Sequence, residues 1–197
     1  MANQTSFSSV TEYVNAASGK KSVAAVPEGV AAEYLGISLS GVSDLLKKGV
    51  LQAMVVEGER SKWRGVMANS LVKNREKREK ERAEWTGKIR KILEDAAKKG
   101  KIIEYGTITE VLGVSSSPQN RAKVSDILDE VAAASHKRDE VLLSALVILK
   151  ARGLPNDKFF ANAATLGAMT DEDEPKSFWE AQTAAVFRKY GKGKKKK

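Results

Sequence analysis

The sequence predicts a mainly α-helical protein with small β-hairpins, organised as two domains that a long basic helix joins. Three observations lead to this prediction. Apolar residues recur at helical spacing in several short segments, glycine follows most of these segments, and two strand-like runs flank a Glu-Gly-Glu-Arg turn. With 197 residues, of which 42% are hydrophobic, the chain is long enough for two small hydrophobic cores.

The two ends of the chain are expected to be flexible. Residues 1–22 are rich in Ser, Asn, Thr and Gly, which predicts a flexible leader with a short helix near residues 11–17. Residues 188–197 are dominated by lysine and contain no acidic residue, so we expect a basic disordered tail.

Residues 23–72 predict a compact domain that begins with two short helices. The first helix ends at Gly36, because glycine readily adopts the left-handed conformation of a helix end. Ser38 or Ser40 then caps the second helix, which Gly49 closes. The apolar side of this second helix consists of Val42, Leu45 and Leu46. A turn of three to four residues joins the two helices, which is the spacing of a helix-turn-helix.

Two strand-like runs follow the second helix. They cover residues 51–56 and 62–67 and flank Glu57-Gly58-Glu59-Arg60, which predicts a hairpin or wing. This order of elements resembles the winged helix-turn-helix of excisionase-type and MerR-type regulators, and it implies a DNA-binding domain. The residues that carry the resemblance, over about 45 positions, are Leu35-Gly36, Ser38 and Ser40, Lys47-Lys48-Gly49-Val50-Leu51, and Ser70-Leu71.

Residues 73–84 predict a charged helical connector. The run KNREKREKER has no apolar residue and fits a solvated helix that Ser70 caps. From Trp85 an apolar stripe continues at helical spacing to Ala96, before Lys98-Lys99-Gly100 ends the helix. The connector therefore becomes the first helix of a second helical, winged-helix-like domain, over residues 85–187.

The second domain is expected to repeat the arrangement of the first. After a short strand or turn, Thr107 caps a helix that ends at Gly113, and Asn120 caps a longer amphipathic helix. The inward-facing residues of the longer helix are Val124, Ile127, Leu128, Val131 and Ala132. The apolar run over residues 141–149 then predicts a buried strand or core helix.

Short motifs in this second domain carry another resemblance. They are Gly100-Lys101-Ile102, Tyr105-Gly106, Leu112-Gly113 and Arg121-Ala122-Lys123. In order and spacing they are similar to the winged-helix domain of DNA alkyltransferases and alkyltransferase-like proteins. The resemblance implies that Tyr105 and Arg121 assist nucleotide flipping and that the helix from Arg121 enters the minor groove. The segment at the place of that family's active-site cysteine, residues 142–149, has neither Cys nor His, so alkyl transfer is impossible.

The basic residues are unevenly distributed. Residues 1–72 hold seven Lys or Arg and six Asp or Glu, whereas residues 102–187 hold eight and thirteen. Residues 73–101 hold twelve and six, and residues 188–197 hold seven and none. The net charge is therefore +1 for residues 1–72 and −5 for residues 102–187, but +6 for residues 73–101 and +7 for residues 188–197. The formal net charge of +9 thus comes from the central segment, residues 73–101, and from the tail. Such segments favour contact with nucleic acid.

The candidate DNA-binding residues lie on the second helix of each pair and on the hairpin. The helix over residues 40–48 presents short hydroxyls that reach phosphates or base edges, and its lysines suit phosphates. Cationic hairpin residues suit the DNA backbone or the minor groove. The candidates are Ser38, Ser40, Ser43, Lys47, Lys48, Arg60, Lys62, Arg64, Arg121 and Lys123. The lysine tail is expected to add nonspecific phosphate contacts.

The composition excludes several classes of site. The chain has no cysteine and one histidine, His136, which excludes thiol catalysis, disulfides and zinc sites built from Cys or several His. No stretch approaches the roughly 18 consecutive apolar residues of a membrane helix, and no secretory signal is recognisable at the start. We therefore expect a cytoplasmic, nucleoid-associated protein that uses no cofactor or metal and does not contact a membrane.

The function predicted from the sequence is non-enzymatic binding of double-stranded DNA, as in a prokaryotic or phage transcriptional regulator. Two alternatives remain open. In one, the protein is a DNA-tethered adaptor whose acidic second domain, residues 102–187, binds a protein partner. In the other, it is a nuclease or repair protein, or a non-catalytic protein that recognises modified bases. No catalytic residue is assigned, because no Asp, Glu, Lys or His cluster has the spacing that such an enzyme needs.

Overall fold

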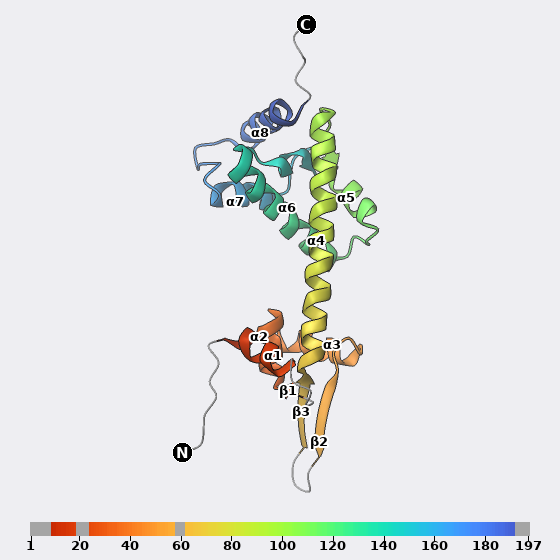
Figure 1. The fold of residues 1–197 in the computed structure, drawn as a ribbon. Coiled ribbons are helices and arrows are strands. Elements are labelled where there is room, and N and C mark those ends of the chain that lie inside the picture. The colour runs from red at the N-terminus through yellow and green to blue at the C-terminus, as the bar shows by residue number, and fades with distance from the viewer. Residues whose placement is uncertain (1–8, 19–23, 58–61, 192–197) are drawn as a thin grey trace. The chain divides into compact units, whose positions relative to one another are not determined.

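The computed structural model describes residues 9–18, 24–57 and 62–191 and divides the chain into two compact units, residues 1–81 and 82–197 (Figure 1). The chain is mainly helical with a small antiparallel sheet, as predicted. Among the described residues, no helix combines the length and the apolar character that crossing a bilayer requires.

The first unit begins with three short helices. They are α1 (Val10–Ser18), α2 (Glu28–Leu35) and α3 (Leu39–Lys47), and α2 packs against both of the others. Gly36 ends α2 in the left-handed conformation, at φ 62° and ψ 39°. Only residues 36–38 separate α2 from α3, which confirms the predicted short turn.

A three-stranded antiparallel sheet completes the first unit. β2 (Ala53–Glu57) and β3 (Lys62–Met67) form the predicted hairpin, with Ala53 opposite Val66 and Glu57 opposite Lys62. The other edge of β3 pairs with β1 (Ala25–Val26), a strand that the sequence did not predict because two residues carry no periodic pattern.

The core of the first unit joins helices and sheet. Its buried residues are Val14, Val26, Ala31, Ala32, Tyr34, Leu35, Val42, Leu51, Val66 and Leu71. The short helix expected near residues 11–17 is confirmed as α1. The expectation that this part of residues 1–22 is a flexible leader is wrong, because the side chain of Val14 is fully buried in the core. Burying an apolar side chain of this size stabilises the helix against α2 by about 1.5 to 3 kcal/mol.

One long helix, α4 (Ala68–Lys98), crosses the boundary between the two units. It begins before Ser70, so the predicted cap is wrong. The hydroxyl of Ser70 is buried, donates to the Met67 carbonyl at 2.8 Å and accepts from the Gln52 N–H at 3.2 Å. Ser70 thus joins the start of α4 to the segment before β2, and the next residue, Leu71, is fully buried in the first core.

The second unit contains the end of α4 and a second pair of helices. These are α5 (Tyr105–Leu112) and α6 (Pro118–Asp139). Thr107 and Asn120 do not cap them, contrary to the prediction. α5 begins at Tyr105 without a side-chain cap, and Ser117 caps α6 by accepting from the Asn120 N–H at 3.3 Å. Both predicted caps lie inside the first helical turn.

The strands of the second unit pair differently from those of the first. β4 (Ile103–Glu104) and β5 (Val147–Ile148) run parallel, because α5 and α6 lie between them in the chain and provide the crossover. The apolar run is buried over residues 141–147, and Ile148 and Leu149 are partly buried. It forms the 3₁₀ helix η1 (Leu143–Leu146) followed by β5, so it is neither one strand nor one helix.

Two further helices, α7 (Asp157–Thr165) and α8 (Pro175–Tyr190), close the second unit. The predicted disordered tail begins too early, because residues 188–190 belong to α8 and the ammonium of Lys189 lies 3.6 Å from the Asp139 carboxylate. The rest of the lysine tail, residues 192–197, lies outside the described residues.

The second unit is held by two buried clusters. The larger includes Trp85, Ile89 and Leu93 of α4 together with side chains of α5, α6 and β5. All five residues that were predicted to face inward on α6 are buried. The smaller cluster joins η1, α7 and α8 through Leu142, Ala145, Phe159, Ala163 and Phe178.

Candidate nucleic-acid interface

α3 and its two capping residues, Ser38 and Lys48, carry five of the eight candidate residues of the first unit. Val42 is fully buried, and Leu45 and Leu46 pack against the core, so the opposite side of the helix faces solvent. Ser40 and Lys47 are exposed on this side, and Ser43 is partly exposed. The structure thus brings together on one helix the polar residues that the sequence predicted.

The start of α3 is ordered by two hydroxyl groups. The Ser38 hydroxyl caps the helix by accepting from the Gly41 N–H at 3.2 Å. It also lies 2.8 Å from the Ser40 hydroxyl, with which it shares a hydrogen bond. Both side chains are exposed. Because these hydroxyls already bond each other, they have less capacity left for a ligand than two separate serines would have.

Lys47 and Lys48 close the same helix. Both are exposed, and within residues 9–18, 24–57 and 62–191 neither forms an ion pair. Lys47 lies in the last turn of α3, where a cation interacts favourably with the free carbonyl groups. The two ammonium groups are therefore available to an anionic partner without breaking a contact within the described part of the unit.

The hairpin presents its cations differently. The guanidinium of Arg64 on β3 donates from Nε to the Glu28 carboxylate at 2.6 Å, and its Nη2 lies 2.5 Å from the same oxygen. Half of the Arg64 side chain remains exposed. A phosphate would therefore have to share or replace Glu28. Arg60 lies outside the described residues, and for Lys62 only its place at the start of β3 is described.

Basic residues in the first half of α4 are partly occupied by contacts within the first unit. Arg75 stacks over the Tyr34 ring, with its guanidinium carbon 5.0 Å from the ring centroid, and donates to Glu79 at 2.8 Å. The hydrogen bond to Glu79 raises the pKa of Arg75 further above its already high ordinary value. Arg78 donates to the Leu35 carbonyl at 3.3 Å. These arginines therefore attach α4 to α2.

The two candidates of the second unit lie in the first turns of α6. The Nε of Arg121 donates to the Ser116 carbonyl at 2.9 Å, while the Arg121 carbonyl accepts from the Tyr105 hydroxyl at 2.9 Å. The Lys123 ammonium lies 5.5 Å from the centroid of the Trp85 ring. Both side chains are exposed, yet each also contributes to the packing of its own unit.

An open groove of about 800 Å³ runs past Arg121. Its charged lining consists of Arg121, Asp126, Lys150, Asp157 and Lys158. Most of these charges are already paired. Lys158 bonds Asp126 at 2.7 Å and Asp129 at 2.9 Å, and Asp157 bonds Arg152 at 2.8 Å. The groove therefore has little uncompensated charge.

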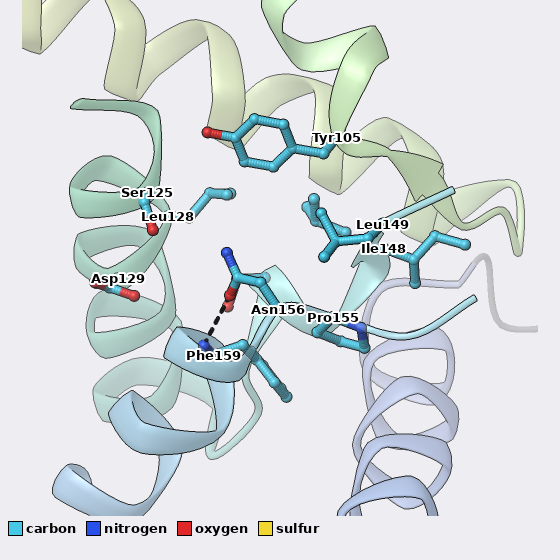
Figure 2. A pocket seen from close by; sticks show the side chains of 11 residues that line it. Tyr105, Ser125, Leu128, Asp129, Ile148, Leu149, Pro155, Asn156 and Phe159 are labelled. Carbon is cyan, nitrogen blue, oxygen red and sulfur yellow. Dashed lines mark hydrogen bonds between the residues drawn. The ribbon is translucent and has the colours of Figure 1, made fainter. Parts of the chain in front are cut away.

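A much smaller pocket of about 20 Å³, shown in Figure 2, shares Tyr105, Ser125, Leu149 and Asn156 with the groove. Tyr105 reaches over it from α5, and Leu128 and Phe159 contribute apolar walls from α6 and α7. The Asn156 side-chain oxygen accepts from the Phe159 N–H at 3.0 Å and so caps α7. A volume of this size holds about one water molecule, and a nucleobase does not fit without rearrangement.

Tyr105 is the titratable group that this pocket alters most clearly. Burial raises the pKa of its phenol, and the nearby charges of Arg121 and Lys158 oppose that shift. The phenol consequently stays protonated near neutral pH and acts as the donor to the Arg121 carbonyl. Its visible role is to join α5 to α6. In the described part of the chain, no three Asp, Glu or His side chains come together as a metal site.

No protein-family model, curated protein or solved structure matches this chain.

Sequence reasoning missed one exposed residue of α3. Leu39 begins the helix, and 59% of its surface is exposed. A leucine beside a helical apolar stripe is ordinarily assigned to a core. The helix start at Ser38 was the signal that places Leu39 in the first turn, beyond the reach of the core.

Proposed function

We propose that this chain is a non-enzymatic protein that binds double-stranded DNA through a winged helix-turn-helix in its first unit. The single observation that carries the proposal is the exposed polar side of α3, which follows α2 after a three-residue turn and precedes an antiparallel hairpin. In such an arrangement the second helix enters the major groove and the hairpin contacts the adjacent backbone.

The charge of the surface supports this choice of partner. Lys47 and Lys48 are exposed at one end of α3, and the start of α3 carries small hydroxyl side chains that do not obstruct approach to base edges. Phosphate contacts give affinity and orientation, and base contacts give sequence preference. The resemblance to excisionase-type and MerR-type regulators suggests the role of a prokaryotic or phage transcriptional regulator acting at the nucleoid in the cytoplasm.

A second candidate function applies to the second unit, which we propose as a protein-binding adaptor. Its candidate cations are already used in packing, since Arg121 bonds Ser116 and Lys123 lies over Trp85. Residues 102–187 also carry a net charge of −5, from eight basic and thirteen acidic residues. Under this proposal the first unit holds the protein on DNA and the second unit recruits a partner.

The experiment that tests both proposals is a salt-titrated binding assay on duplex DNA with the full chain. Replacing Lys47 and Lys48 by Ala should weaken binding to all duplexes and reduce the slope of log affinity against log salt by about two, roughly one per lost phosphate contact. The control is a double variant of exposed lysines elsewhere, Lys137→Ala with Lys176→Ala, which changes the net charge equally.

A third variant, Arg121→Ala with Lys123→Ala, separates the two roles of the second unit. If that unit is an adaptor, this variant keeps the wild-type salt slope, whereas DNA contact by α6 would lower the slope by about two. Equal slopes for the Lys47 and Lys48 variant and the wild type would exclude α3 as the DNA-binding helix.

A further inference from the structure

Leu39 is the most exposed large apolar side chain in the part of the chain that the structure describes. Its exposed fraction is 59%, above the 50% of Val111 and the 47% of Val50. The other leucines of α3, Leu45 and Leu46, are partly buried against the first core. Leu39 therefore contributes little to the core, although it belongs to the same helix.

Small residues follow Leu39 in the first turns of α3, so its side chain extends beyond theirs into solvent. The other residues of the first turns of α3 are Ser40, Gly41, the fully buried Val42, and Ser43. Ser43 follows Leu39 by four positions, so the two lie on the same side of the helix, one turn apart. Leu39 is thus the one large exposed side chain between the Ser38 cap and Ser43, and the residues that follow it up to Ser43 are small except for the buried Val42.

This position is where a groove-binding helix contacts base edges. Helices in the major groove read bases mainly with residues near their N-terminus. The hydroxyls of Ser38 and Ser40 lie 2.8 Å apart and bond each other, which leaves less of their hydrogen-bonding capacity for bases. An alkyl side chain has one specific complement in that groove, the C5-methyl group of thymine.

Two features favour DNA over a protein as the partner of this side chain. The exposed Lys47 lies on the same helix, and its charge complements a phosphate backbone. Leu39 is the exposed large apolar residue of α3, whereas Val42 is buried and Leu45 and Leu46 are partly buried against the core. The exposed apolar surface of this helix is therefore small compared with the patch that a protein partner typically covers.

We infer that Leu39 contacts a thymine methyl group and thereby sets part of the sequence preference of the α3 surface. This inference rests on the proposed function and adds to it a specificity-determining residue. The contact requires a methyl group and no hydrogen bond, so at this position the surface prefers thymine and recognises it through its C5-methyl carbon.

The test compares thymine with uracil inside an otherwise identical duplex. A duplex is first enriched from a random pool with the wild-type full chain, and each thymine in it is then replaced singly by deoxyuridine. Deoxyuridine keeps every hydrogen-bonding group of thymine and lacks only the methyl. For the wild type, one replacement should weaken binding about fourfold, as expected for the loss of one buried methyl group. The Leu39→Ala variant should bind the thymine duplex more weakly and show no further loss with uracil.

Two further variants keep the test decisive. Leu39→Met retains a large apolar side chain and should restore the discrimination between thymine and uracil. Val111→Ala removes a side chain of similar exposure on α5 and should leave both affinity and discrimination unchanged. Leu39→Ala places a good helix former at an exposed position, so circular dichroism should show an intact fold.

The outcomes distinguish a failure of the inference about Leu39 from a failure of the proposed function. A wild type that binds the enriched duplex but tolerates uracil at every position overturns the role of Leu39 and leaves DNA binding intact. Equal uracil sensitivity in the wild type and Leu39→Ala does the same. Failure of the wild type to enrich any duplex at low salt overturns the proposed function, and the inference falls with it.

Discussion

Lys47 and Lys48 differ from Arg64 and Arg78 in what they contact. Arg64 pairs with Glu28, and Arg78 donates to the Leu35 carbonyl, so both guanidinium groups already contribute to structure. The two lysines are exposed and form no ion pair among the described residues. A phosphate can therefore bind them without a compensating loss. This difference explains why net charge alone, which is +1 over residues 1–72, does not identify the binding surface.

A different residue reports on the integrity of the second unit. Tyr190 near the end of α8 donates to the Asp139 carboxylate at 2.6 Å and accepts from the Arg138 guanidinium at 2.6 Å. Burial, together with the hydrogen bond to Asp139, raises the pKa of Tyr190 from its ordinary value of 10 to about 12. The same network lowers the pKa of Asp139, mainly through the hydrogen bond from Tyr190.

The raised pKa of Tyr190 gives a prediction at high pH. The folded state favours the neutral phenol, so this group stabilises the fold fully below pH 10 and progressively less as the pH rises through about 12. In an ultraviolet titration of tyrosinate, the wild type should show one phenol that ionises near pH 12. Tyr190→Phe should remove that step and flatten the loss of unfolding free energy with pH. An unchanged titration curve would show that Tyr190 is not in this network.

At the scale of elements, the position of α3 depends on how its first turn begins. Ser38 is the residue that ends the turn and satisfies a free N–H of α3. Ser38→Ala should lower the unfolding free energy of the first unit by about 1 kcal/mol, whereas Ser38→Asp should retain most of it, because a carboxylate also caps a helix. Urea unfolding measures both. Equal losses for Ala and Asp would mean that the cap contributes little.

Helix ends were easier to predict from the sequence than helix starts. Gly36 and Gly113 end α2 and α5 at φ 62° and 68°, a conformation that glycine adopts far more readily than other residues. Helix starts have several acceptable residues. Ser115, Ser116, Ser117 and Asn120 all precede or begin α6, and the choice of Ser117 follows from the packing of α6, which the local sequence does not contain.

The candidate site was predictable from the sequence where it depends on local spacing, and not where it depends on contacts between distant segments. The polar side of α3 follows from the helical spacing of its apolar residues, and Val42 is buried as expected. The pairing of Arg64 with Glu28 joins residues 36 positions apart and could not be read from either segment alone. The exposure of Leu39 likewise depends on where the core ends in three dimensions.

At the scale of the whole molecule, each unit has a core of its own. The core of the first unit is built from residues between Val14 and Leu71. The two buried clusters of the second unit are built from residues between Trp85 and Val186, so the units share no core residue. α4 supplies Leu71 to one and Ile89 and Leu93 to another. Two separate cores allow one unit to bind DNA and the other to hold a second ligand, as the adaptor proposal requires.

The distribution of charge over the whole chain is consistent with different roles for the two units, as the adaptor proposal requires. The formal net charge of +9 arises from residues 73–101 and from the tail, whereas residues 102–187 are net acidic. Basic segments add affinity for any duplex and carry no sequence information. Under the proposed function, sequence preference therefore comes from α3 and should be measurable separately from this background.

The most direct test of the central claim is the affinity of the wild-type full chain for an enriched duplex and for random duplexes across a range of salt concentrations. The account predicts that affinity for both falls steeply as salt rises, and that the enriched duplex is bound more tightly by a factor of about 10³ or more at every salt concentration. Affinity that is independent of both salt and sequence, or no binding in dilute buffer, would contradict it.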